Sequence, residues 1–132
     1  MKLSHDELKN LMKNKLMKAG LNEDHADIAA EVMTWSDERG YHSHGAVRVE
    51  YYAERIAKGG ITANPKFEWE ETGPCSGVFE GDNGCGYAVA KYGMDKAIEM
   101  AKKNGIAVVG MKNMSHSGSI GYYTEMAAEQ GL

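Results

Sequence analysis

The sequence predicts an α+β protein, with a helical segment over residues 1–64 followed by the start of an α/β domain over residues 65–132. Apolar residues recur at helical spacing in three stretches before residue 59. Both prolines then fall within residues 61–74, which show no helical period. Beyond them, short apolar runs alternate with helical patterns, as expected for strands and helices in turn.

The first two helices carry clear boundary signals. Ser4 and Glu7 form the pattern of a capping box, and Gly20 ends the apolar period that follows them. Asn22 is suited to cap a second helix, which Arg39-Gly40 closes.

The second half is predicted to hold two short strands, a long helix, a further strand and a last helix. These elements are expected at residues 67–71, 76–80, 87–104, 106–110 and 119–132. Asp82-Asn83-Gly84 indicates a turn after the second strand, and Gly105 is expected to end the long helix. The unbroken apolar run at 106–110 favours a buried strand. Because a strand would normally follow a last helix of this kind, we expect the chain to be part of a longer protein.

Composition and charge argue against several classes of partner. The formal net charge is −4 and the basic residues are scattered, whereas proteins that bind nucleic acid usually carry a basic stripe. No apolar run approaches the roughly 18 residues that span a bilayer, and the N-terminus lacks the apolar core of a signal peptide. Cys75 and Cys85 are expected to be free thiols in a reducing cytoplasm.

The most informative stretch begins a third helix, predicted over residues 43–58 with Ser43 as its N-cap. His44, Arg48 and Tyr52 would then share one stripe. An imidazole can move a proton near neutral pH, and a guanidinium can hold a carboxylate through two parallel hydrogen bonds. These residues therefore indicate proton transfer on an anionic substrate. The alternative is that Ser43 is only a cap and Arg48 only a solvated surface charge.

A second cluster, Ser115-His116-Ser117-Gly118, follows the C-terminal end of a predicted strand. Ligands of open α/β sheets bind at such strand ends, so His116 is a candidate acid or base. The alternative is an ordinary capping loop with an exposed histidine.

Two other patterns suggest a metal site and a dinucleotide-binding loop, but each lacks residues that such a site needs. His42 and His44 have the spacing of metal ligands, but no cluster of Cys or carboxylate residues accompanies them, so no metal is expected. Gly84 and Gly86 suggest a dinucleotide loop, but Val89 stands where the third glycine is needed.

At its two clusters the chain resembles the type-2 malate/L-lactate dehydrogenase family of NAD(P)-dependent oxidoreductases. The resemblance implies a mixed-sheet α/β domain over residues 65–132, in a fold unlike the Rossmann dehydrogenases. It also implies NAD or NADP as cofactor, a small 2-hydroxy acid as substrate, and a homodimer or larger homo-oligomer. The matching residues are Asp37, Arg39-Gly40, Ser43-His44-Gly45, Arg48 and His116-Ser117-Gly118.

The same resemblance implies a role for each residue. His116 would accept the substrate proton, while His44 would bind the reacting oxygen or, in reductive relatives, donate the proton. Ser43, Arg48 and Tyr52 would bind the substrate. Most cofactor contacts are expected beyond Leu132, and any within this chain at His116, Ser117 and Gly118. These 132 residues alone are therefore expected to be inactive.

Two alternatives remain open. In the first, the protein is an enzyme of the same family, and the open question is whether its substrate is malate, lactate, sulfolactate, a keto-sugar acid or another 2-hydroxy acid. In the second, the chain is a non-catalytic helical assembly module.

Overall fold

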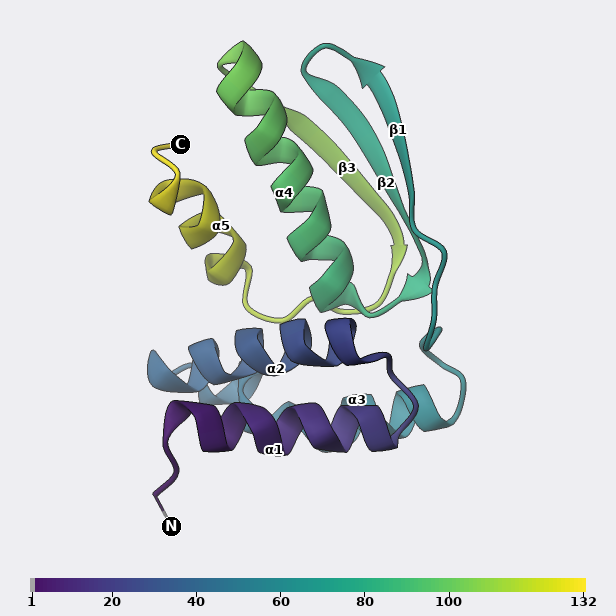
Figure 1. The fold of residues 1–132 in the computed structure, drawn as a ribbon, viewed down its shortest axis with the longest axis vertical. Coiled ribbons are helices and arrows are strands. Elements are labelled where there is room, and N and C mark those ends of the chain that lie inside the picture. Colours follow the sequence, from purple (N-terminus) through teal and green to yellow (C-terminus); the bar gives the residue numbers. More distant parts are fainter. Residues whose placement is uncertain (1) are drawn as a thin grey trace. The chain divides into compact units, whose positions relative to one another are not determined.

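The computed structural model describes residues 2–132 and divides into two compact units, Met1–Asn64 and Pro65–Leu132. The first contains α1 (His5–Lys18), α2 (Glu23–Glu38) and α3 (Val49–Ala57), with α1 packed against both other helices (Figure 1). Met12 and Leu16 of α1 are buried in this unit, as is Ile56 of α3. The capping box is confirmed, because the Ser4 hydroxyl accepts from the Glu7 amide and the Glu7 carboxylate accepts from the Ser4 amide.

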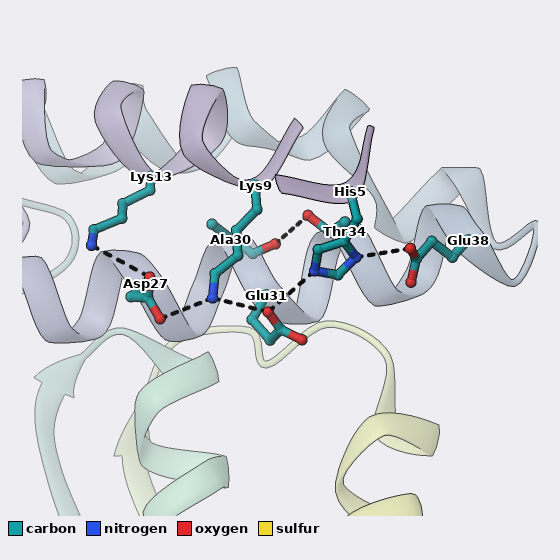
Figure 2. Close-up of polar contacts among 8 residues, drawn as sticks. All are labelled: His5, Lys9, Lys13, Asp27, Ala30, Glu31, Thr34 and Glu38. Atoms are coloured by element: carbon teal, nitrogen blue, oxygen red, sulfur yellow. Dashed lines mark hydrogen bonds and ion pairs between the residues drawn. The ribbon is translucent and has the colours of Figure 1, made fainter. Parts of the chain in front are cut away.

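A row of ion pairs joins α1 to α2, and we call it the helix-pair ladder (Figure 2). Each of its cations contacts two carboxylates, at distances between 2.8 and 3.6 Å. The hydrogen bond to Glu38 raises the pKa of His5. Partial burial favours the neutral form of Asp27, but Lys9 and Lys13 outweigh it and lower the pKa of this carboxyl group. The ladder consists of His5, Lys9 and Lys13 on α1, and of Glu23, Asp27, Glu31 and Glu38 on α2.

The predicted start of the third helix is wrong. Residues 42–48 form two 3₁₀ turns, His42–His44 and Ala46–Arg48, and the α-helix begins only at Val49. A continuous α-helix would need the Arg48 amide to donate to the His44 carbonyl, four residues before it. That amide donates instead to the Gly45 carbonyl, three residues before it, at 3.0 Å, and Gly45 itself leaves the helical region with φ of −93° and ψ of −145°. Ser43 therefore caps no α-helix, and the predicted helical stripe does not form.

The second unit is a three-stranded mixed sheet with two helices. It contains β1 (Glu68–Gly73), β2 (Ser76–Gly84), α4 (Gly86–Asn104), β3 (Val108–Met114) and α5 (Ile120–Glu129). The strand order is β1-β2-β3, in which β1 and β2 run antiparallel and β2 and β3 run parallel. Helix α4 crosses from β2 to β3 and packs on both, and α5 packs on α4 (Figure 1). The predicted α+β class with a mixed sheet is confirmed.

Two expectations for this unit need correction. Asp82 and Asn83, with φ of 48° and 52°, form no turn after β2 but an irregularity within it, where the register with β3 shifts. The apolar run at 106–110 is not buried, since Ile106 is 64% exposed and Val108 is 67% exposed. β3 is one of the two edge strands of the sheet within residues 2–132, so an apolar sequence does not by itself ensure burial here.

Glycine conformation ends α4 as predicted. Gly105 adopts a left-handed φ of 85°, and its amide donates to the Ala101 carbonyl at 2.7 Å. Phe67, Phe79 and Tyr92 pack edge to face, with ring centroids 5.4 and 5.9 Å apart, and so link the sheet to α4.

Candidate active site

Residues 39–48 connect α2 to α3, and we call them the substrate loop because they carry three of the predicted site residues. The loop is held by its own backbone. The His44 amide donates to Tyr41 at 2.9 Å, and the Gly45 amide donates to His42 at 3.2 Å. The Arg48 amide donates to Gly45 at 3.0 Å, which closes the second 3₁₀ turn.

Ser43 and His44 present a hydroxyl and an imidazole side by side. The Ser43 hydroxyl oxygen lies 2.9 Å from Nδ1 of His44. Ser43 is exposed and His44 is half-buried, so both lie at the surface of the described chain. Such a pair can hydrogen-bond a substrate oxygen and support proton transfer.

Arg48 completes this cluster through its guanidinium group. Its Nε donates to the Ser43 carbonyl at 2.7 Å. This bond fixes the guanidinium against the loop and leaves the terminal nitrogens, Nη1 and Nη2, for an end-on grip on a carboxylate. Arg48 is the N-cap residue of α3 rather than a residue one turn inside a helix, which corrects its predicted position.

Tyr52 lies on α3 and is buried. It is only 4% exposed, with the Tyr51 ring 5.4 Å away in an edge arrangement. Arg55, in contrast, is exposed and donates to the Tyr51 hydroxyl at 3.1 Å. The contact of Tyr52 with substrate stays a prediction.

His116 lies in a loop that is held tightly against the N-terminus of α4. The Gly86 amide donates to the Ser115 hydroxyl at 2.8 Å, and the Ser115 amide donates to the Gly84 carbonyl at 3.2 Å. A Cβ at Gly86 would lie no farther than 2.5 Å from the carbonyl oxygens of Ser115 and His116. Only glycine permits this approach, which explains part of the Gly84-x-Gly86 pattern without any nucleotide.

The rest of this loop orients the imidazole. The Gly118 amide donates to Nδ1 of His116 at 3.3 Å, and the Tyr123 hydroxyl donates to the Ser117 carbonyl at 2.6 Å. Gly118 has φ of 75°, and its α-carbon lies against the Tyr87 ring. His116 itself is exposed. An exposed imidazole on a well-held loop is suited to exchange a proton with a small molecule.

The structure thus brings Ser43, His44 and Arg48 together in one loop of the first unit. It brings His116, Ser117 and Gly118 together in one loop of the second unit. That the two loops form a single site stays a prediction.

The sequence reasoning gave Asp37 no role, although its carboxylate is the main side-chain contact of the substrate loop. One sequence signal could have indicated this role of Asp37: it is an acidic residue a few positions before Gly45, a glycine that directly follows a histidine.

Other reactive groups do not add to the site. Both cysteines are free, as predicted, and burial raises the pKa of the Cys85 thiol to about 11, which keeps it protonated near neutral pH. Within residues 2–132, no group of three or more His, Cys, Asp or Glu side chains could hold a metal ion. None of the helices in this range is both long and apolar enough to cross a membrane.

Comparison with known proteins places these clusters in a family. The chain is 54% identical over 132 residues to the ureidoglycolate dehydrogenase (NAD(+)) of Escherichia coli K12, covering all of this chain and 38% of that protein. It is 38% identical over 131 residues to the malate dehydrogenase of Pyrococcus abyssi, covering 99% of this chain and 36% of that protein. It therefore spans well under half the length of these curated relatives.

Solved structures agree. The malate dehydrogenase of Pyrococcus horikoshii OT3 superposes with a TM-score of 0.94 at 37% identity, covering 99% of this chain and 38% of that one. The sulfolactate dehydrogenase of Methanocaldococcus jannaschii superposes with a TM-score of 0.93 at 36% identity, covering 98% of this chain and 38% of that one. The family model for malate/L-lactate dehydrogenase matches residues 3–132. This chain belongs to the malate/L-lactate dehydrogenase family.

Proposed function

We propose that this chain supplies the substrate loop and a proton-transferring histidine of an NAD-dependent 2-hydroxy acid dehydrogenase. The observation that carries the proposal is the substrate loop, which presents a hydroxyl, an imidazole and a guanidinium together at Ser43, His44 and Arg48. We further propose that the substrate is ureidoglycolate, oxidised to oxalurate in the breakdown of allantoin.

One comparison supports ureidoglycolate over other acids. The chain is 54% identical to a ureidoglycolate dehydrogenase but 38% identical to a malate dehydrogenase, over nearly the same span.

The proposed chemistry follows from the groups that the loops present. Oxidation of a 2-hydroxy acid removes a hydride from C2 and a proton from the hydroxyl group. Arg48 would hold the carboxylate end-on, because its Nε already binds the Ser43 carbonyl. His44 would hydrogen-bond the reacting oxygen, and Ser43 and Tyr52 would complete the wall of the substrate site. Placing these groups correctly contributes to the rate by orienting the substrate before reaction.

His116 is the proposed proton acceptor, and its ring is restrained by the bond from the Gly118 amide. General acid–base help of this kind is worth about 10² to 10⁴ in rate. His44 is the alternative acceptor, since its Nδ1 lies within hydrogen-bond distance of the Ser43 hydroxyl.

The cofactor proposed is NAD, with NADP as the alternative. Bound NAD would accept the hydride. Helix α5 begins after Ser119 with no side-chain cap and no acidic residue in its first turn, which suits an anionic group of a dinucleotide. Ser117 and Gly118, which lead into this helix, are the residues of this chain that would hold it.

The test is a substrate panel on the whole protein. Reduction of NAD and NADP is followed by absorbance with ureidoglycolate, malate, lactate and sulfolactate, and the oligomeric state is measured by light scattering. We expect the highest kcat/KM with ureidoglycolate and NAD, from a cytoplasmic homodimer or larger homo-oligomer. A higher kcat/KM with another acid would overturn the substrate proposal. Turnover with none of these acids would favour the assembly-module alternative.

A further inference from the structure

Asp37 lies in the last turn of α2, and its side chain contacts the substrate loop at two points. Its Oδ1 lies 2.9 Å from Nδ1 of His42, and its Oδ2 accepts from the Ala46 amide at 2.7 Å. The side chain of Asp37 is 17% exposed, whereas that of His42 is 76% exposed. The better shielded of the two contacts is therefore the one to the Ala46 backbone.

The carboxylate also packs directly on Gly45. A Cβ built on Gly45 would lie closer than 3.0 Å to the carboxyl carbon and both oxygens of Asp37. Gly45 is buried and lies between the two 3₁₀ turns of the loop. Asp37 thus occupies the space of a missing side chain at the corner of the loop.

That corner sets the relative position of the proposed substrate contacts. Ser43 and His44 lie in the turn before Gly45, and Arg48 ends the turn after it. The bond from Arg48 Nε to the Ser43 carbonyl spans the corner, so its geometry depends on how the two turns meet.

We propose that Asp37 is a positioning residue that holds the substrate loop in the shape needed to bind the 2-hydroxy acid. This inference rests on the proposed function. Both carboxylate oxygens are engaged within the protein, so Asp37 acts through the Ala46 amide and Gly45 and not by contact with substrate. Its loss should therefore impair hydroxy acid turnover and leave cofactor affinity unchanged.

The test compares four variants of the whole protein with the wild type. Asp37→Ala removes both contacts, and Asp37→Asn keeps an oxygen that can accept from the Ala46 amide. Gly45→Ala drives a methyl group into the carboxylate. The fourth variant combines Asp37→Ala with Gly45→Ala, so that the shortened side chain makes room for the methyl group. Asp95→Asn is the matched control, because that exposed carboxylate only pairs with Lys91 on α4.

We expect kcat/KM for the hydroxy acid to fall about 10- to 100-fold in Asp37→Ala and in Gly45→Ala, as a displacement near 1 Å can cause. Asp37→Asn should lie between Asp37→Ala and the wild type. The double variant should be no worse than the worse single variant, because the two changes act on one contact. NADH affinity, measured by fluorescence titration, should be unchanged in every variant, and Asp95→Asn should match the wild type.

A second readout does not depend on activity. Hydrogen–deuterium exchange of the peptide containing Ala46 should become faster in Asp37→Ala and stay slow in the control. If the wild type turns over no hydroxy acid, the proposed function fails, yet the exchange result still decides whether Asp37 holds the loop. Unchanged exchange overturns the inference, as does a normal kcat/KM in Asp37→Ala or an equal loss of NADH affinity. Should Asp37→Ala not fold, Asp37→Asn decides by the same measurements.

Discussion

Replacing Gly86 with alanine should disrupt the His116 loop and slow catalysis. The new Cβ would lie 2.5 Å from the His116 carbonyl oxygen and closer still to that of Ser115, whereas ordinary contact begins at 3.4 Å. Both atoms belong to the backbone, so no flexible side chain can yield, and the loop must retreat by about 1 Å or more. Alanine favours a helix over glycine by roughly 0.5–1 kcal/mol. Overpacking costs about 1–3 kcal/mol, and loss of the Gly86–Ser115 hydrogen bond about 0.5–1.5 kcal/mol more, so the clash wins.

Urea unfolding and steady-state kinetics of the whole enzyme measure this effect. We expect Gly86→Ala to lower the free energy of unfolding by about 0.5–4 kcal/mol, the balance of those terms. It should also reduce kcat about 100-fold, because a displacement of this size misplaces the proton acceptor. Gly110→Ala in β3 is the matched control, since the nearest atom to its Cβ is Val78 Cγ2 at 3.9 Å. If Gly86→Ala unfolds and turns over like Gly110→Ala, the His116 loop is not held in the way described.

Three further predictions concern the two clusters and the helix-pair ladder. Arg48→Lys should raise KM for the hydroxy acid, because lysine cannot both bind the Ser43 carbonyl and bind a carboxylate at two points. The expected loss of substrate binding free energy is about 1–3 kcal/mol. If Arg55→Lys, at an exposed position, behaves in the same way, Arg48 does not bind the substrate carboxylate. His116→Asn should lower kcat by a factor of about 10² or more and leave NADH affinity unchanged. A near-normal kcat would instead assign the proton transfer to His44. The raised pKa of His5 means that its ion pair stabilises the fold below the unfolded-state pKa and ceases to do so as pH rises through the folded-state pKa. Thermal unfolding of His5→Gln should thus differ from the wild type at pH 6 and match it at pH 9, and a difference that persists at pH 9 would contradict this.

Local signals predicted the helices well, because each depends on residues close in sequence. The capping box at Ser4 and the left-handed Gly105 are satisfied within a few residues of themselves. The start of α3 was missed because the backbone of Gly45 leaves the helical region, with φ of −93° and ψ of −145°, and the period of apolar residues does not encode that break. The exposure of Val108 was missed because burial of an apolar strand depends on what covers the sheet.

In the candidate site, too, the features that depend on residues close in sequence were predicted, and a contact between more distant residues was not. Ser43, His44 and Arg48 were recognised from residue type and spacing, and they do form one cluster. Asp37 was not assigned, because its role depends on a carboxylate filling the space of a missing Cβ, and that fit is visible only in three dimensions.

The helix-pair ladder has a consequence for how this protein tolerates sequence drift. Lys9 contacts two carboxylates and Lys13 contacts two, with Asp27 shared between them, and His5 also has two acidic partners. Loss of any one of the four acidic residues therefore leaves every cation with a remaining acceptor. Neutral substitutions can accumulate singly at these positions, and only the loss of a neighbouring pair leaves a cation of the ladder without an acidic partner from it. The redundancy buffers the first unit against mutation as well as joining α1 to α2.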